Sequence, residues 1–219
     1  MALPKPFYED GSVTIYHGDA RAILPSLGHI DLLLTDPPYG MDYQHGARKG
    51  GRRMGADGQS IAGDSEPFDP VHLLGYRQVA LWGGNHFADS LPASRGWLIW
   101  DKRDGIPPND QSDCELAWTN FLTTARLFSA RWSGGHRTGR EQQQGRVHVN
   151  QKPVALMAWC IGWAKDVGLI CDPYMGSGST LVAAKELGHR AIGIELEERY
   201  CQIAAERCSQ EVLDLGAAA

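Results

Sequence analysis

The stretch GLICDPYMGSGSTLVAAKELGHRAIGIE, residues 168–195, indicates the fold class because its residues predict a strand, a loop, a helix and a second strand in succession. The apolar run over 168–172 is typical of a buried strand. The helix predicted over 179–188 begins with hydroxyl side chains that can cap it and ends at a glycine. The second apolar run, 190–195, follows directly. Since a helix is the usual connection between parallel strands, the segment predicts a parallel sheet.

Short apolar runs rich in β-branched residues recur along the rest of the chain and predict further strands. With helices over 153–166 and 197–216, they favour an α/β fold in which helices cover both faces of a mainly parallel sheet of about seven strands. Few residues separate 115–119 from 125–132, so we expect these runs to form an antiparallel hairpin at one edge. The predicted strands cover 13–17, 30–35, 78–84, 96–102, 115–119, 125–132, 168–172 and 190–195.

The composition is that of one globular domain spanning 1–219. Hydrophobic residues make up 42% of the chain, which is enough for a sizeable core. The formal net charge of −5 excludes a general attraction to nucleic acid, so such binding needs a local basic patch. The five cysteines lack metal-binding or disulfide spacing and are expected to be reduced, as in a cytosolic protein. The apolar run over 154–164 is too short to cross a bilayer and the first residues lack a signal-peptide core, so no membrane partner is expected.

Two long glycine-rich stretches, 40–64 and 133–151, fit no regular element and are basic in an otherwise acidic chain. Four basic residues against two acidic ones give a formal charge of +2 over 41–63, and five against one give +4 over 131–152. Loops of this length are usually functional or disordered. Both are therefore predicted to be flexible basic loops, with a plain solvated loop as the alternative for each.

The glycines of DPYMGSGST, residues 172–180, favour a ligand at the start of the following helix. Gly176 and Gly178 let the backbone approach a ligand closely, and the helix N-terminus offers unpaired N–H groups. Glu195 ends the next strand roughly 20 residues on, where a carboxylate can accept hydrogen bonds from ribose hydroxyls. The pair indicates an adenosine-containing cofactor; a tight turn and an exposed strand-end glutamate are the alternatives.

A second unusual strand end occurs in DLLLTDPPYG, residues 31–40, where a buried strand stops at an acid followed by two prolines and a tyrosine. Successive prolines fix φ and remove two N–H donors, so they hold a rigid turn. Taken alone, this segment also fits a strand-end turn capped by an aspartate.

Four segments, in this order, resemble the β-class of S-adenosylmethionine-dependent DNA amino-methyltransferases: HGDA (17–20), DPPY (36–39), HVNQKP (148–153) and DPYMGSGST (172–180). The resemblance covers nearly the whole chain and implies the Rossmann-like fold of methyltransferases that use S-adenosylmethionine. In the family the third segment reads H-P-T-x-K-P, so Val149 and Asn150 depart from the pattern, while His148, Lys152 and Pro153 match it. The resemblance implies that the cofactor is bound by Asp19, Gln151, Lys152, Asp172, Pro173, Tyr174, Gly176, Ser177, Gly178, Ser179, Thr180, Glu195 and Leu196.

The resemblance also implies a catalytic motif of Asp36, Pro37, Pro38 and Tyr39. The lone pair of an exocyclic amine is delocalised into the base, so the nitrogen needs acceptors for its two hydrogens. The Asp36 carboxylate and the Pro37 carbonyl would be these acceptors, held in place by the rigid turn. Tyr39 would stack on a base flipped out of the duplex, and the methyl group would pass in line from sulfonium to nitrogen. This chemistry needs neither a cysteine nucleophile nor a metal.

The first residue of the motif bears on the choice of base. In the family, D-P-P-Y is typical of methylation at the adenine 6-amino group, and S-P-P-Y of methylation at the cytosine 4-amino group. Asp36 therefore favours methylation of adenine in double-stranded DNA. Cytosine 4-amino methylation, RNA methylation and an inactive subunit that only binds cofactor and DNA stay open as alternatives.

The target-recognition region is reduced, since only 133–151 and the loop over 40–64 remain for it. Short basic loops favour phosphate contacts over base readout, so we expect a short or relaxed recognition sequence.

Trp82 could line the pocket for the flipped base, but packing in the core is the simpler interpretation. Asp101 and Lys102 are interpreted as structural residues. A homodimer would enlarge the DNA surface, and a bacterial or phage-encoded protein would lie in the cytoplasm with the nucleoid. The expected phosphate contacts are Arg48, Lys49, Arg52, Arg53, Arg137 and Arg140.

Overall fold

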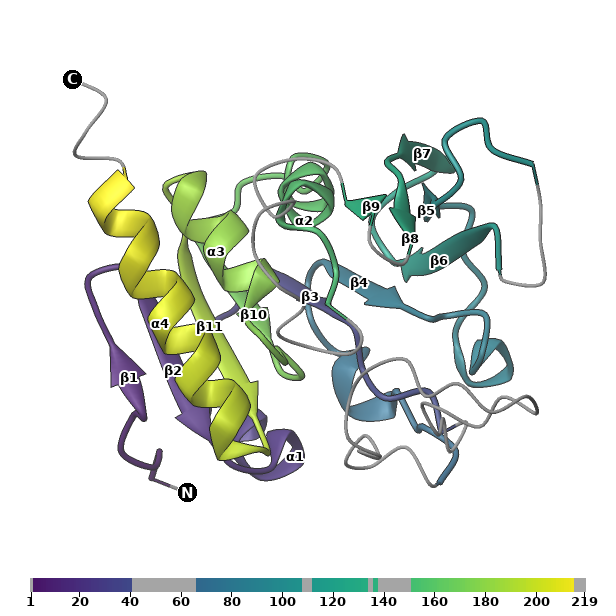
Figure 1. Ribbon diagram of the computed structural model, residues 1–219. Coiled ribbons are helices and arrows are strands. Elements are labelled where there is room, and N and C mark those ends of the chain that lie inside the picture. The colour runs from purple at the N-terminus through teal and green to yellow at the C-terminus, as the bar shows by residue number, and fades with distance from the viewer. Residues whose placement is uncertain (1, 41–65, 108–111, 134–135, 138–150, 215–219) are drawn as a thin grey trace, which may run out of the picture.

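The computed structural model describes residues 2–40, 66–107, 112–133, 136–137 and 151–214 (Figure 1). Most of the two predicted basic loops therefore lies outside the described residues. The same holds for the expected phosphate contacts Arg48, Lys49, Arg52, Arg53 and Arg140, and Arg137 is described only as part of a short strand.

Within the described part of the chain, nine strands form one sheet in the order β1-β2-β11-β10-β3-β4-β6-β5-β7 (Figure 1). Strands β2, β11, β10, β3 and β4 are parallel to one another, as predicted for the body of the sheet. A separate antiparallel pair is formed by β8 and β9. The bounds are β1 Tyr8–Glu9, β2 Val13–His17, β3 Leu32–Thr35, β4 Val79–Trp82, β5 Trp97–Asp101, β6 Cys114–Thr119, β7 Arg126–Ser129, β8 Trp132–Ser133, β9 His136–Arg137, β10 Leu169–Asp172 and β11 Arg190–Glu195.

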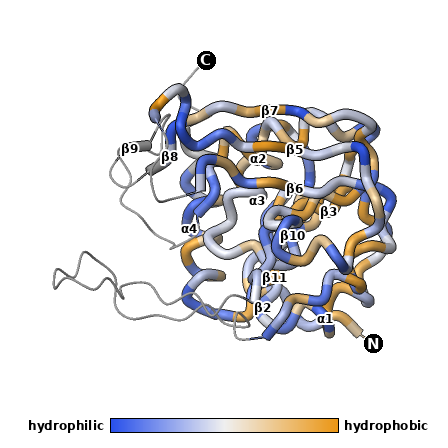
Figure 2. Tube along the Cα trace, turned by 90° about the vertical axis from the view of Figure 1, so that its right-hand side faces the viewer, coloured by the Kyte–Doolittle hydropathy of each residue, from blue (hydrophilic) through white to orange (hydrophobic). Residues whose placement is uncertain are grey.

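Helices cover both faces of this sheet. Successive strand residues point to opposite faces, so Leu32 and Leu34 of β3 pack with α2, α3 and α4, while Leu33 packs with α1, η1 and η2. The sheet therefore separates two apolar clusters, one on each face. Figure 2 shows hydrophobic segments along its strands. The helix bounds are α1 Ala20–Ile23, α2 Val154–Ile161, α3 Ser179–Glu186 and α4 Glu198–Asp214, with 3-10 turns η1 Leu24–Ser26, η2 Val71–Leu73 and η3 Ala88–Ser90.

The strand count and one pairing differ from the prediction. The sheet has nine strands rather than about seven, and the hairpin predicted between 115–119 and 125–132 is wrong. Instead, β6 lies between β4 and β5 and is antiparallel to both, whereas β7 is parallel to β5 at the sheet edge. Residues 117–119 of β6 are buried, which suits an interior strand, while most of β7 is exposed. Burial rather than a short connection therefore decides this pairing. An antiparallel pair does close the opposite edge, between β1 and β2.

The predicted helices are present with changed lengths. Helix α2 stops at Ile161, earlier than predicted, and after the C-cap Gly162 the N–H groups of Trp163 and Ala164 turn to i→i+3 hydrogen bonds. Helices α3 and α4 begin at or next to their predicted first residues. No helix in the described part of the chain is both long and apolar enough to cross a membrane.

Candidate active site

Strands β3 and β10 bring the two predicted motifs together at one edge of the sheet. The two strands are parallel neighbours, with Leu33 paired to Cys171, so their carboxyl ends lie side by side. Thr35 ends β3 and Asp172 ends β10, and the Thr35 hydroxyl donates a hydrogen bond of 2.6 Å to the Asp172 carboxylate. The DPPY turn and the glycine loop therefore start from adjacent points.

The Asp172 carboxylate organises the glycine loop. It is buried, and besides the Thr35 hydroxyl it accepts hydrogen bonds from the Thr180 hydroxyl at 2.6 Å and from the Tyr174 backbone N–H at 3.2 Å. Burial raises the pKa of Asp172 to about 6, and the hydroxyl donors oppose this shift. Because these contacts reach both ends of the loop, they hold the path of the backbone between them.

Helix α4 supports the same loop from the side. Gly178 has a φ of +80°, and a Cβ at this position would lie 2.8 Å from the Cβ of Ala204, so a side chain does not fit between loop and helix. One turn further along α4, Arg207 donates a hydrogen bond of 2.6 Å to the Ser177 carbonyl. Arg207 was not predicted as a site residue. An arginine beside the buried Ala204 and Cys208 of a predicted helix is a signal that could have indicated it.

Two further carboxylates lie at the carboxyl ends of β11 and β2. Glu195 accepts hydrogen bonds from the backbone N–H of Gly176 at 3.0 Å and of Glu197 at 2.8 Å, and burial raises its pKa. Asp19 follows β2 and caps α1 by accepting a hydrogen bond of 2.8 Å from the Arg21 N–H. The predicted cofactor residues therefore gather along the ends of four neighbouring strands, β2, β11, β10 and β3.

The predicted cofactor residues differ in their exposure. Asp19 and Leu196 are exposed, and Tyr174, Gly176 and Glu195 are half-buried. The buried members are Gln151, Lys152, Asp172, Pro173, Ser177, Gly178, Ser179 and Thr180.

Asp36 lies directly after β3 in a group with Tyr39 and Lys152. The Tyr39 hydroxyl donates a hydrogen bond of 2.5 Å to Asp36 Oδ1, and the Lys152 ammonium pairs with Asp36 Oδ2. Burial raises the pKa of Asp36, and the charge of Lys152 opposes that shift. Lys152 was predicted as a cofactor residue, whereas the structure places its ammonium against the predicted catalytic acid.

Glu115 of β6 extends this group toward the other half of the sheet. Its Oε2 lies 3.0 Å from Lys152 Nζ, and its Oε1 lies 3.1 Å from Lys102 Nζ. Glu115 was not predicted as a site residue, and Lys102 was taken as structural. The available signal was an acid within the apolar strand ELAWT, although the sequence does not indicate which cation pairs with it.

Comparison with known proteins identifies the family. The family model described as DNA methylase (N6_N4_Mtase) matches residues 99–206. The Type II methyltransferase M2.DpnII of Streptococcus pneumoniae is 36% identical over an alignment of 259 residues, which covers 96% of this chain and 95% of the relative. The chain belongs to the DNA methylase family. It is therefore a DNA methyltransferase, as the sequence predicted.

Solved structures of methyltransferases share the fold of this methylase. The complex of M1.HpyAVI with SAM has a TM-score of 0.54 at 21% identity and covers 89% of this chain and 98% of that chain. The cytosine-N4-specific PvuII DNA methyltransferase has a TM-score of 0.62 at 15% identity and covers 93% of this chain and 88% of that chain. The predicted Rossmann-like methyltransferase fold is confirmed.

The ring of Tyr39 is held by the end of β4 in the methylase. It stacks on His86, with ring centroids 4.7 Å apart and an angle of 17° between the planes. Gly83 has a φ of +71°, and a Cβ there would lie 1.9 Å from Tyr39 Cε1. Trp82 is fully buried in the cluster with α2 and α3, which agrees with the core interpretation of this residue. Glycine at position 83 is therefore required for the observed place of the Tyr39 ring.

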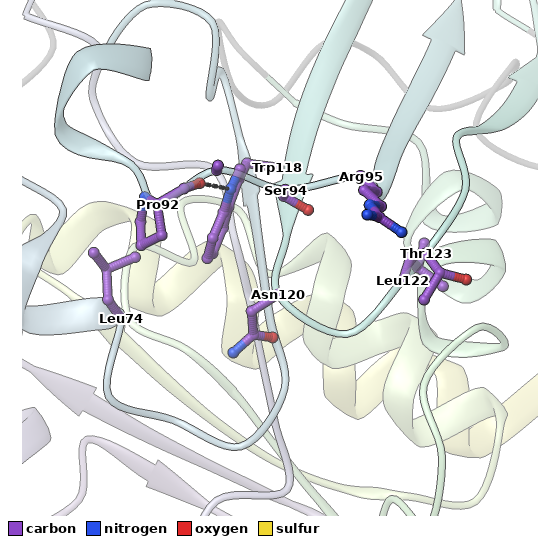
Figure 3. Close-up of a pocket in the computed structure, with 9 residues that line it drawn as sticks. Leu74, Pro92, Ser94, Arg95, Trp118, Asn120, Leu122 and Thr123 are labelled. Atoms are coloured by element: carbon purple, nitrogen blue, oxygen red, sulfur yellow. Dashed lines mark hydrogen bonds between the residues drawn. The ribbon is translucent and has the colours of Figure 1, made fainter.

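A cavity of about 280 Å³ lies near the amino end of β4, away from the carboxyl ends of the parallel strands (Figure 3). Asn120 lines it and accepts a hydrogen bond of 2.8 Å from the N–H of Val79, the first residue of β4. Trp118, another lining residue, donates a hydrogen bond of 2.8 Å to the Pro92 carbonyl. None of the predicted site residues that the structure describes lines this cavity. Within the described ranges, no cluster of three or more His, Cys, Asp or Glu side chains is arranged to hold a metal ion.

Proposed function

We propose that this DNA methylase transfers a methyl group from S-adenosylmethionine to the 6-amino group of adenine in DNA. The hydrogen bond of 2.6 Å between Thr35 and Asp172 carries the proposal. It joins the strand that ends in the predicted target motif to the strand that ends in the predicted cofactor loop. Methyl transfer needs target and donor within contact distance, and adjacent strand ends in a parallel sheet provide this arrangement.

The residues at the cofactor edge fit S-adenosylmethionine. The cofactor supplies an activated methyl group on a sulfonium when it is bound. Glu195 uses both oxygens for backbone N–H groups, yet a carboxylate has about four acceptor positions and keeps capacity for hydroxyls. Asp19 is exposed at the neighbouring strand end and offers a second acceptor. Gly176 and Gly178 both have positive φ, and the Gly176 backbone itself contacts Glu195 through its N–H.

Asp36 is the acceptor for the target amine in this proposal. As the new N–C bond forms and the S–C bond breaks, the amino nitrogen becomes cationic and must lose one proton. A carboxylate with a raised pKa accepts such a hydrogen more readily than an ordinary one. Tyr39 supplies the stacking surface, and because His86 covers one face of its ring, a flipped base stacks on the other face or displaces His86.

The assignment of adenine rests on the DPPY motif. Cytosine 4-amino methylation uses the same geometry and is the second candidate. The likeness to the cytosine-N4-specific PvuII enzyme concerns the fold, at 15% identity, and does not favour either base.

Double-stranded DNA is the proposed partner, with short or relaxed sequence recognition. The alignment with M2.DpnII extends over 259 residues, more than the 219 of this chain, so that relative carries segments that this chain lacks. Fewer residues for base readout support a less selective enzyme. We also propose that basic residues of the two loops contact DNA phosphates, although most of these residues lie outside the described part of the chain. We further propose a homodimer, which would enlarge the surface for DNA. A bacterial cytoplasmic location with the nucleoid is proposed on the same family grounds.

The test is methyl transfer from labelled S-adenosylmethionine to unmethylated duplex DNA, followed by mass spectrometry of the nucleosides. A 6-methyladenine peak that is absent with Asp36→Ala supports the proposal. A 4-methylcytosine peak keeps the chemistry and overturns the base assignment. Cofactor binding without any methylated nucleoside would contradict DNA methylation by this chain.

A further inference from the structure

Four charged side chains of alternating sign run from the predicted catalytic acid, which follows the central strand β3, toward β6 and β5 near one edge of the sheet. Asp36 pairs with Lys152, Lys152 lies 3.0 Å from Glu115, and Glu115 lies 3.1 Å from Lys102. The exposed fractions of these side chains are low, from 7% for Lys152 to 27% for Glu115. Buried ions are stable only when they are paired, so this arrangement defines one neutral group.

We propose that Glu115 is a positioning residue that controls how strongly Asp36 accepts a hydrogen from the target amine, because it shares the Lys152 ammonium with Asp36. The inference rests on the proposed function, in which Asp36 is that acceptor. An ammonium bound to Asp36 alone would neutralise the carboxylate and weaken it as a proton acceptor. A second carboxylate on the same ammonium restores the negative charge that Asp36 needs.

The electrostatics of the group agree with this role. Burial lowers the pKa of Lys152, but Asp36 and Glu115 outweigh burial and raise it well above its ordinary value. Burial raises the pKa of Glu115, but Lys152 and Lys102 outweigh burial and lower it. Burial raises the pKa of Asp36 most strongly, and Glu115 adds to this rise while Lys152 opposes it. Lys152 therefore stays charged and Glu115 stays ionised while their shared contact acts on Asp36.

The other polar groups near Asp36 that the structure describes do not share its cation Lys152 as a second carboxylate, as Glu115 does. The Tyr39 hydroxyl faces Asp36 from the same turn, and burial raises the pKa of Tyr39 well above its ordinary value, so it stays neutral. His86 contacts the group through its stack on the Tyr39 ring. Asp172 comes from β10 and uses its oxygens for Thr35, Thr180 and the loop backbone. Glu115 is therefore the carboxylate that shares a cation with Asp36.

The position of β6 explains why Glu115 can reach this site. β6 runs antiparallel between β4 and β5, so the start of β6 lies at the edge where β3 and β4 end. Trp100 of β5 pairs with Glu115 across the sheet, and Lys102 follows β5 on the same side. The inserted antiparallel strand thus delivers an acid to the carboxyl ends of the parallel strands.

The test is a pH titration of the Asp36 carboxylate, followed by 13C NMR and assigned with Asp36→Asn, in wild type and two variants. Glu115→Gln removes the shared carboxylate, so the pKa of Asp36 should fall by about one unit. Lys102→Met removes the cation that competes for Glu115, so the pKa of Asp36 should rise. These opposite shifts support the inference. Unchanged titration of Asp36 in both folded variants would overturn it.

Activity gives a second readout with a matched control. In Glu115→Gln, kcat should fall about 10-fold with its acid limb moved to lower pH, while KM for S-adenosylmethionine stays within about 2-fold. Glu115→Asp should recover part of kcat. Asp113→Asn removes an exposed carboxylate that pairs with Arg103 just before β6, and it should leave the pH profile unchanged. Lower stability of Glu115→Gln with an unmoved profile would mean a purely structural salt bridge. Since the NMR titration needs no substrate, it tests the inference even if wild type methylates no DNA and the proposed function fails.

Discussion

The Thr35 hydroxyl at the end of β3 is hydrogen-bonded to the Asp172 carboxylate at the end of β10, at 2.6 Å. The two residues are far apart in the sequence, yet each stands next to one of the two motifs of the methylase. Thr35 precedes the DPPY turn, and Asp172 begins the glycine loop. This contact therefore couples the proposed place of the target to the proposed place of the cofactor.

Thr35→Val should lower the free energy of unfolding by about 1–3 kcal/mol, because it leaves a buried carboxylate with one donor fewer. Thr180→Val removes the other hydroxyl donor to Asp172 and should have an effect of similar size. Urea denaturation of both variants checks this. The control is Thr123→Val on the exposed surface, which should change stability by less than about 0.5 kcal/mol. A Thr35→Val variant as stable as wild type would contradict the structural role of the bond.

The burial of Asp172 makes stability depend on pH in a defined direction. Its pKa is raised to about 6 in the folded protein, so the folded state holds this proton more tightly than the unfolded state does. The stabilising effect of the proton is complete below about pH 4 and is lost as the pH rises through about 6. Relative to Asp172→Asn, wild type should lose about 3 kcal/mol of unfolding free energy between about pH 4 and pH 7. Denaturation curves at several pH values measure the difference, and a constant difference would speak against the shift.

Gly83→Ala should displace the Tyr39 ring. The added Cβ would lie 1.9 Å from Tyr39 Cε1, and φ at this position is +71°, so the ring must move by more than about 1 Å. A shift of that size in a positioning group can reduce the rate up to about 100-fold, so kcat for methyl transfer should fall at least about 10-fold. Cofactor affinity should change little. Gly75→Ala is the matched control, since a Cβ there meets nothing within 4 Å, and it should keep wild-type kcat.

Arg207→Met should weaken cofactor binding without abolishing methyl transfer. It removes the hydrogen bond of 2.6 Å to the Ser177 carbonyl, so the glycine loop loses one support from α4. We expect the Kd for S-adenosylmethionine to rise about 10-fold while kcat at saturating cofactor stays within about 2-fold. Isothermal titration calorimetry measures the first quantity. Gln202→Ala, on the exposed side of the same helix, should leave the Kd unchanged. An equal loss in both variants would point to the stability of α4 instead.

Much of the parallel part of the fold could be predicted because its signals are local. Apolar runs such as 30–35 and 190–195 are buried on both faces of a sheet, and Gly188 marks the end of a helix. The hydroxyl cap predicted for this helix is wrong, because Gly178 is its N-cap and the Thr180 hydroxyl donates to Asp172 instead. The hairpin predicted for 115–119 and 125–132 was wrong because pairing between strands depends on which faces are buried after assembly. The short connection between these two runs allows them to pair as a hairpin, but it does not exclude pairing with other strands.

The motifs, their order and the chemistry they resemble follow from the sequence alone, since the residue types of DPPY and DPYMGSGST are enough to recognise them. Which charges meet at Asp36 depends on the tertiary structure. Lys152 and Glu115 come from separate segments, and β6 enters the sheet out of chain order and in antiparallel direction. The pKa of a buried carboxylate depends on charges within a few ångströms in space, and local sequence patterns do not specify those distances.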